Sequence, residues 1–345
     1  MTARWPTLLR IGVCGVVVVV LALAPSWATL GQLRNLVELL TLLTLAQMWN
    51  LLAGYAGLVS IGQQAYIGIG AYAFYALGDK ASVHPYLAVL LAGLIAGAIS
   101  LPSAALVFRL RAGYFAIGTW VVAEVFHLLV LNSSSLGGGA GVSILFVSDI
   151  ERRTREFATY WMALGLGLGA IALAYLLLRS RTGLALTAIR DNEEGAEGVG
   201  VNVLRAKVGI YVIAALGCGL AGAVTYLSLL RIQPDAAFTV NLTAFMIFIV
   251  VIGGLGTLEG PIIGTVIFYV LQQQFSSYGV WYLVALGVVA VAFAVWVPRG
   301  IWGWVAERYD VHLFPLRRRF RGVYGDTERH VASMTTAGGG TAGEG

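Results

Sequence analysis

The sequence contains little charge for its length. Only 11% of its 345 residues are Asp, Glu, Lys or Arg, whereas 59% are hydrophobic and the mean hydropathy is +0.83. A water-soluble domain covers its surface with roughly 25% charged residues, so most of this surface must face something other than water. The composition excludes a disordered chain and a large soluble catalytic domain. It predicts an all-α fold, a polytopic helical membrane protein.

Residues that catalyse reactions or hold cofactors are also scarce. Neither of the two lysines, Lys80 and Lys207, lies in a G-x-x-x-x-G-K-[ST] sequence, so the chain carries no P-loop for ATP hydrolysis. The four histidines are scattered, and Cys14 and Cys218 lie in separate apolar runs. We therefore expect no enzyme, no metal and no cofactor. Despite a net charge of +5, nucleic acid is not an expected partner, because the basic residues flank apolar runs on both sides of a membrane.

Apolar runs long enough to cross a membrane recur along the chain. A helix needs about 20 apolar residues to cross the hydrocarbon core. The sequence predicts about ten segments, the eighth and ninth of them short or broken, at 10–29, 36–53, 58–78, 86–108, 113–131, 157–178, 208–230, 241–254, 261–276 and 281–297. The first run follows Arg4 and Arg10 and is about 20 residues long, which favours an uncleaved anchor over a cleaved signal peptide.

The basic residues predict the orientation. With the N-terminus in the cytoplasm, sixteen of the 22 Lys and Arg residues lie inside and six outside, as the positive-inside rule requires. We expect a multi-pass protein of the cell inner (plasma) membrane with both termini in the cytoplasm. Residues 1–300 would form the transmembrane domain, with a cytoplasmic loop at 179–207. Residues 301–345 would form a tail that is basic around 317–321, near lipid headgroups, and then Gly/Thr-rich and partly disordered.

Several polar side chains interrupt the apolar runs. Such groups cost free energy in lipid unless they face water or a partner. Two interpretations stay open, a lining of a solute pathway and polar contacts that hold helices together. The candidates for the pathway are Gln47, Asn50, Ser60, Gln63, Gln64, Tyr66, Glu124 and His127. Glu124 is the only carboxylate well inside a run, which gives little support to an ion-coupled transporter.

Two further segments depart from simple apolar runs. A glycine-rich segment, which predicts either a tight cytoplasmic turn or a broken helix pair, contains Gly253, Gly254, Gly256, Gly260, Pro261 and Gly264. The loop 179–207 predicts one short amphipathic helix, with Ile189, Ala196, Val199 and Val203 on its apolar face. That helix would either dock into a groove of a cytosolic partner or lie solvated on the surface.

These segments together resemble the permease subunits of branched-chain amino acid ABC importers of the LivM type. The family's G-Y-x-G-L-x-S-x-G-x-x-[AG]-[FY]-x-G-I-G-A-Y pattern matches Gly54 to Tyr72. Its A-I-R-x-x-E-x-x-A-E-x-x-G-I-N pattern is similar to Ala188 to Asn202, and its G-G-x-G-[ST]-x-x-G-P-x-x-G pattern matches Gly253 to Gly264. The resemblance covers about residues 35–297. Gln63 stands where many members have His, and Asn241 where they more often have Ser.

The resemblance implies a transport machine of several subunits. A second permease subunit, two ATP-binding subunits and a periplasmic or extracytoplasmic binding protein would be the partners, and ATP would be hydrolysed on the separate subunits. The loop would then contain the helix that couples to the ATPase, through Ala188, Arg190, Glu193, Ala196, Glu197 and Gly200. The implied substrates are leucine, isoleucine and valine. The alternatives are a urea or short-amide permease, a secondary transporter or channel without an ATPase, and a membrane scaffold.

Overall fold

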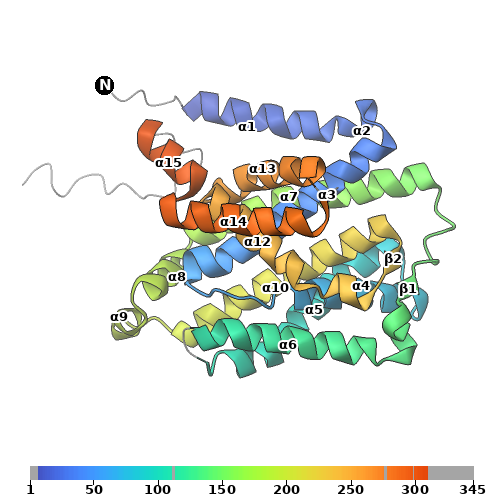
Figure 1. Cartoon of the computed structure of the whole chain (residues 1–345), viewed down its shortest axis with the longest axis horizontal. Helices are drawn as coiled ribbons and strands as arrows, with labels where there is room; N and C mark the ends of the chain where they lie inside the picture. The colour runs from blue at the N-terminus through green and yellow to red at the C-terminus, as the bar shows by residue number, and fades with distance from the viewer. Residues whose placement is uncertain (1–6, 111–112, 276–277, 298, 310–345) are drawn as a thin grey trace, which may run out of the picture. The chain divides into compact units, whose positions relative to one another are not determined.

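The computed structural model describes residues 7–110, 113–275, 278–297 and 299–309. Within these ranges the chain is almost entirely helical (Figure 1), which confirms the all-α prediction. The β structure of the described part is one antiparallel pair of two-residue strands, β1 (Val142–Ser143) and β2 (Arg231–Ile232). The basic run at 317–321 and the Gly/Thr-rich end that the sequence predicts lie outside the described residues, as do Arg4 and Arg111.

The elements follow one another with short connections. In chain order they are α1 (Thr7–Ala22), α2 (Ala24–Trp27), α3 (Leu30–Asn50), the π-helix η1 (Leu51–Tyr55), α4 (Gln64–Asp79), α5 (Pro85–Val107), α6 (Gly113–Leu131), the 3-10 turns η2 (Ser134–Leu136) and η3 (Gly138–Ala140), β1, α7 (Arg152–Arg179), α8 (Arg181–Asp191), α9 (Glu193–Gly198), α10 (Val203–Leu229), β2, α11 (Pro234–Ala237), α12 (Val240–Gly253), α13 (Gly260–Phe275), α14 (Val280–Trp296) and α15 (Gly300–Tyr309).

Seven stretches of the described chain are helical, long and apolar enough to cross a membrane. They are Leu30–Tyr55, Pro85–Val107, Gly113–Leu131, Arg152–Arg179, Val203–Leu229, Pro234–Gly253 and Leu283–Arg308. The structure thus supports a multi-pass protein, but the number ten is not confirmed. The predicted segments 10–29, 58–78 and 261–276 correspond to α1, α4 and α13, which have 16 residues each. At 1.5 Å per residue, such a helix covers about 24 Å of a hydrocarbon core about 30 Å thick.

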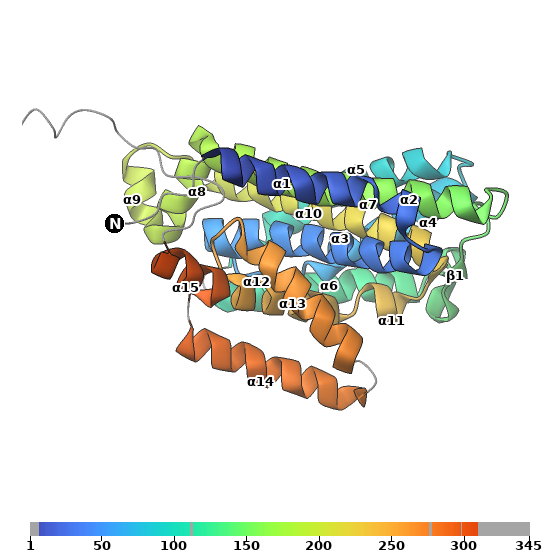
Figure 2. The same cartoon turned by 90° about the horizontal axis from the view of Figure 1, so that it is seen from above.

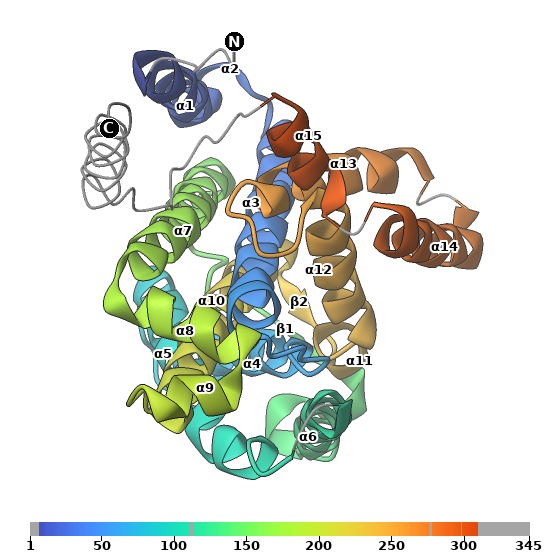
Figure 3. The same ribbon diagram turned by 90° about the vertical axis from the view of Figure 1, so that its left-hand side faces the viewer.

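Helices α3, α4 and α10 form the buried centre of the described bundle. Figure 3 shows α3 between α7 and α12, and α10 packs against α3, α4 and α5. Small residues let two of these helices approach closely. A Cβ atom placed on Gly70 of α4 would lie 2.6 Å from the Cα of Gly219 in α10, and one on Gly222 would lie 2.9 Å from the carbonyl carbon of Ile67. Backbone contact of this kind stabilises helix pairs in lipid, where burial of leucine gains little.

Helices α6 and α14 lie at the edge of the bundle and expose apolar side chains. Figure 2 shows α14 beside α13, away from α3 and α10. Ile117 and Leu129 of α6 are 56% and 62% exposed, and Val291 of α14 is 65% exposed. Such surfaces would promote aggregation in water, so they face lipid or another membrane subunit.

Candidate functional site

The chain leaves α3 through a π-helix and an irregular segment before α4 begins. The π-helix η1 follows α3 directly, and its five residues are all buried. The N–H of Leu58 bonds to the carbonyl oxygen of Leu52 at 2.9 Å. The indole N–H of Trp49 donates to the carbonyl oxygen of Ser60 at 2.9 Å, which ties the irregular segment back to α3. This detour explains why the apolar run 58–78 forms a helix only from Gln64 onward.

The glycine-rich segment is a tight turn between two closely packed helices. Helix α12 ends at Gly253 and α13 begins at Gly260. The turn is stabilised by Thr257, whose hydroxyl accepts the N–H of Gly260 at 3.0 Å and donates to the carbonyl of Gly254 at 2.8 Å. A Cβ on Gly253 would lie 2.6 Å from the carbonyl carbon of Gly260, so only glycine allows this approach. We call residues 254–259 the glycine turn.

Gln47 and Asn50 bind the glycine turn to α3. The amide of Asn50 accepts the N–H of Gly256 at 2.9 Å and donates to the carbonyl of Thr257 at 2.8 Å. Gln47 donates to the carbonyl of Leu258 at 2.8 Å, while its Oε1 is buried without a hydrogen-bond partner. Both side chains are fully buried. Two motifs more than 200 residues apart in the sequence therefore share one junction inside the protein.

Ser60, Gln63, Gln64 and Tyr66 gather where α4 begins, and all four are buried. Gln63 donates to the hydroxyl of Ser60 at 3.3 Å and accepts the thiol of Cys218 at 3.6 Å. Their other partners come from α10 and α12. The Thr243 hydroxyl donates to Gln64, and Tyr66 donates to the Tyr211 hydroxyl at 2.9 Å. Thr243 and Tyr211 were missed from sequence, because a single polar residue in an apolar run does not reveal its distant partner.

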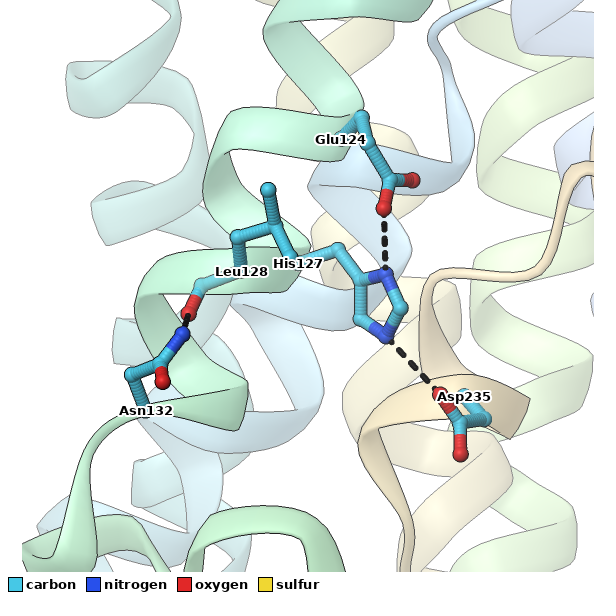
Figure 4. A network of polar contacts seen from close by, with 5 residues as sticks. All are labelled: Glu124, His127, Leu128, Asn132 and Asp235. Atoms are coloured by element: carbon cyan, nitrogen blue, oxygen red, sulfur yellow. Dashed lines mark hydrogen bonds and ion pairs between the residues drawn. The ribbon is translucent and has the colours of Figure 1, made fainter.

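Glu124 and His127 lie apart from that cluster, on α6. The two ring nitrogens of His127 contact Glu124 at 3.0 Å and Asp235 of α11 at 3.1 Å, as Figure 4 shows. The carboxylates are 52% and 80% exposed, whereas His127 is 15% exposed. The His127 ring also stacks on Phe238, with centroids 5.8 Å apart. Asp235 was missed, because it lies in a short connection that carries no motif.

The loop 179–207 folds into two helices and not the single helix that the sequence predicts. Asn192 separates α8 from α9. Its side chain accepts the N–H of Gly195 at 2.9 Å and is the N-cap of α9. Ile189, Ala196 and Val203 form a buried cluster as predicted. The placement of Val199 on that apolar face is wrong, since its side chain is 81% exposed.

The end of α9 explains the position of Val199. Gly200 has a φ of +88°. Its N–H bonds to the carbonyl of Glu197 at 2.9 Å, and the N–H of Val201 bonds to the carbonyl of Ala196 at 3.0 Å. This is a Schellman C-cap, for which glycine is preferred at the left-handed position. The turn directs the chain back toward α10 and leaves Val199 outside.

The residues predicted for ATPase coupling point in different directions. Ala196 is buried and Ala188 packs against the same cluster, whereas Glu197 is exposed. Glu193 pairs with Lys207 of α10, with Nζ and Oε2 2.7 Å apart. Arg190 reaches away from α9 and donates from Nη1 to the carbonyl oxygen of Gly54 at 2.8 Å.

The Glu193–Lys207 pair gives a direct test of how Glu193 acts. Glu193→Lys is expected to weaken the attachment of α9 to α10 by about 1 kcal/mol or less, because the carboxylate is 52% exposed. Exchanging the charges, in Glu193→Lys with Lys207→Glu, should restore it. The measurement is the rate of proteolytic cleavage within 190–205 in the full-length protein in nanodiscs. If the exchange cleaves as fast as the single variant, Glu193 does not act through Lys207.

Comparison with known proteins places the chain among transport permeases. A family model described as "Branched-chain amino acid transport system / permease component" matches residues 32–296. The high-affinity branched-chain amino acid transport system permease protein LivM of Salmonella typhimurium is 28% identical over 278 residues, 73% of this chain and 65% of that protein. LivM of Escherichia coli K12 is 27% identical over 314 residues, 82% of this chain and 73% of that protein.

Similarity also extends to a sugar permease, over a shorter range. The ribose import permease protein RbsC of Escherichia coli K12 is 28% identical over 138 residues, 38% of this chain and 43% of that protein. The match to LivM of Salmonella typhimurium spans 65% of that protein, slightly less than two thirds of its length. No solved structure matches it.

Proposed function

Because the chain belongs to the family of permease components of branched-chain amino acid transport systems, we propose that it carries leucine, isoleucine and valine across the inner membrane. The family makes it a non-catalytic transmembrane subunit of an ATP-driven importer. The observation that carries the substrate class is the extent of similarity. The match to LivM of Escherichia coli includes 82% of the chain, whereas the match to the ribose permease includes 38%.

The proposed partners are a second permease subunit, two ATP-binding subunits and an extracytoplasmic binding protein. Helices α8 and α9 would bind an ATP-binding subunit. This assignment is supported by the place and the charge of the loop. The loop lies at one end of the bundle beside the end of α3 (Figure 1). Glu194, Glu197 and Val199 are exposed around α9, and Leu184 is exposed on α8, so the loop offers acidic groups together with two apolar side chains. A partner groove with basic residues and an apolar pocket would complement it.

The proposed pathway passes the polar cluster at the start of α4. Ser60, Gln63 and Gln64 are buried and bonded to one another or to α10 and α12. When the helices separate during alternating access, the same groups would be exposed to water and solute. A polar side chain within the membrane must bond either to another protein group or to water. Gln47, Asn50 and Tyr66 border this region, and Glu124 and His127 would lie at the outer end of the pathway.

The proposed orientation places both termini and the α8–α9 loop in the cytoplasm. Single cysteines at Ser134 and Asp149, both exposed, should react with a membrane-impermeant maleimide added to intact spheroplasts. A cysteine at Asn192, also exposed, should react only after the membrane is opened. Labelling of the position 192 cysteine in intact spheroplasts would contradict this orientation.

Uptake by cells tests the substrate class. Deleting the chain should strongly reduce uptake of radiolabelled leucine at submicromolar concentration, and a plasmid copy should restore it. Unlabelled isoleucine and valine in excess should compete, and urea and ribose should not. Normal leucine uptake combined with lost urea or ribose uptake would assign the chain to another substrate.

A further inference from the structure

Three segments far apart in the sequence meet at the end of α3. They are α8, the π-helix η1 and the glycine turn. Gly54 in η1 contacts both of the others. Its carbonyl oxygen accepts a hydrogen bond from Arg190, and a Cβ on Gly54 would lie 2.7 Å from the amide nitrogen of Gly256. We call these contacts the α3 junction.

The end of the helix frees the carbonyl that Arg190 binds, because η1 stops at Tyr55 and Gly57 turns the chain with a φ of +70°. In a continuous α-helix the N–H of Leu58 would bond to Gly54, four residues earlier. Here that N–H bonds to the carbonyl of Leu52. The carbonyl of Gly54 thus lacks its intrahelical donor, and an arginine from another segment satisfies it, as basic side chains do at helix ends. Short π-helical turns are frequent at functional sites.

The guanidinium of Arg190 is held in one orientation. Its Nε and Nη2 both contact Oδ1 of Asp191 at 3.0 Å, while Nη1 points to Gly54. A lysine ammonium could make one of these contacts, but it lacks the planar guanidinium that makes them all at once. Close packing also fixes α8, because a Cβ on Gly57 would lie 3.2 Å from Cγ of Arg190.

The α3 junction extends from Arg190 to the glycine turn. A Cβ on Gly256 would lie 3.4 Å from Nη1 of Arg190, and Asn50 binds Gly256 and Thr257 directly. Tyr55 is within electrostatic range of both Arg190 and Glu259, and its buried hydroxyl makes no hydrogen bond. Buried polar groups are normally paired.

We propose that Arg190 is a positioning residue that transmits movement of the α8–α9 loop to η1 and the glycine turn. It acts through Gly54, inside the permease, and not by binding the ATPase. The inference rests on the proposed function, because movement of the loop is attributed to an ATP-binding subunit. Displacing α8 would pull on the carbonyl of Gly54, shift η1 and so release or tighten the turn that joins α12 to α13.

Hydrogen–deuterium exchange tests the contact without any partner subunit. The full-length protein in nanodiscs would be compared with Arg190→Ala, Arg190→Lys and the control Arg181→Ala, an exposed arginine of the same helix. We expect exchange in 51–58 and 254–259 to rise about tenfold for Arg190→Ala, because a hydrogen bond from a charged donor is lost. Arg190→Lys should be intermediate and Arg181→Ala unchanged. Unchanged exchange in Arg190→Ala would overturn the proposal, whatever the chain transports.

The ratio of ATP hydrolysed to leucine transported separates transmission from docking. In proteoliposomes with the partner subunits, Arg190→Ala should keep the ATP-binding subunits bound. The number of ATP molecules hydrolysed per leucine transported should rise about tenfold above that of the wild type, which is within the usual range of coupling free energies. Arg190→Lys should give an intermediate ratio. An unchanged ratio would overturn the proposal. Loss of the ATP-binding subunits would also overturn it, since it would mean that Arg190 docks the ATPase. Failure of the wild-type complex to transport leucine would instead contradict the proposed function.

Discussion

Gly70→Val is expected to prevent α4 from packing on α10 and to lower the unfolding temperature by about 2–4 °C. The side chain would be placed on the backbone of Gly219, with the Cβ 2.6 Å from its Cα and 2.7 Å from its carbonyl carbon. Backbone atoms cannot rotate away, so the helices must separate. Such overpacking costs about 1–3 kcal/mol, a large part of the stability of most folds. The measurement is thermal unfolding of the purified chain in nanodiscs.

Gly165→Val provides the matched control. Gly165 lies on α7, and a Cβ there would have no atom within 4 Å. Gly165→Val introduces the same side chain as Gly70→Val and changes the intrinsic helix propensity by the same small amount. The unfolding temperature should therefore stay near that of the wild type. Equal losses in the two variants would contradict the close contact of α4 with α10.

Asn50→Leu is expected to destabilise the α3 junction by about 1–3 kcal/mol and to abolish leucine uptake. The substitution keeps the number and branching of side-chain heavy atoms but leaves two half-buried backbone groups unpaired, the N–H of Gly256 and the carbonyl of Thr257. A polar group buried without a partner costs more than the hydrogen bond was worth. Denaturation in nanodiscs and uptake by cells measure the two effects.

Asn132→Leu is the control for that variant. Asn132 is exposed after the end of α6 and donates only to the carbonyl of Leu128 in the preceding helical turn (Figure 4). Surface changes of this kind usually alter stability by about 0.5 kcal/mol or less. If Asn50→Leu is as stable and active as Asn132→Leu, the glycine turn does not depend on α3.

Composition alone predicted the class of fold, whereas the number of ten membrane segments was not confirmed. Apolar runs report burial or contact with lipid, but they do not show where a helix begins. The run 58–78 starts with an irregular segment because the chain leaves a π-helix and turns before Gln64. The segment at 261–276 forms α13 (Gly260–Phe275), as short as expected, because the glycine turn uses the residues before Gly260. The late start of α4 comes from backbone geometry that hydropathy does not record.

The loop 179–207 shows a signal that sequence reasoning could have used. Asn192 followed by Glu193 and Glu194 is a typical helix start, with a capping side chain and acidic residues in the first turn. Combined with Gly200 as a C-cap, it predicts a separate short helix and places Val199 outside. The hydrophobic period alone favoured a single helix, and that interpretation was wrong.

The contacts of the polar residues could not be predicted from the sequence. The pairing of Asn50 with Gly256 and of His127 with Asp235 joins residues 206 and 108 positions apart. Such pairs depend on which helices pack together, and a polar residue in an apolar run only indicates that some partner or water must exist. The direction of Arg190 was also hidden, because the sequence does not show that the helix ends at Tyr55 and leaves the carbonyl of Gly54 free.

Leucine accumulation in proteoliposomes tests most directly that this chain is the permease of an ATP-driven importer. The complex purified through this chain would be reconstituted with its binding protein, and ATP would be supplied to the side that exposes α8 and α9. The account predicts accumulation that requires ATP hydrolysis and persists when a protonophore collapses the proton gradient. Accumulation by this chain alone, driven by a proton or sodium gradient without ATP, would contradict it.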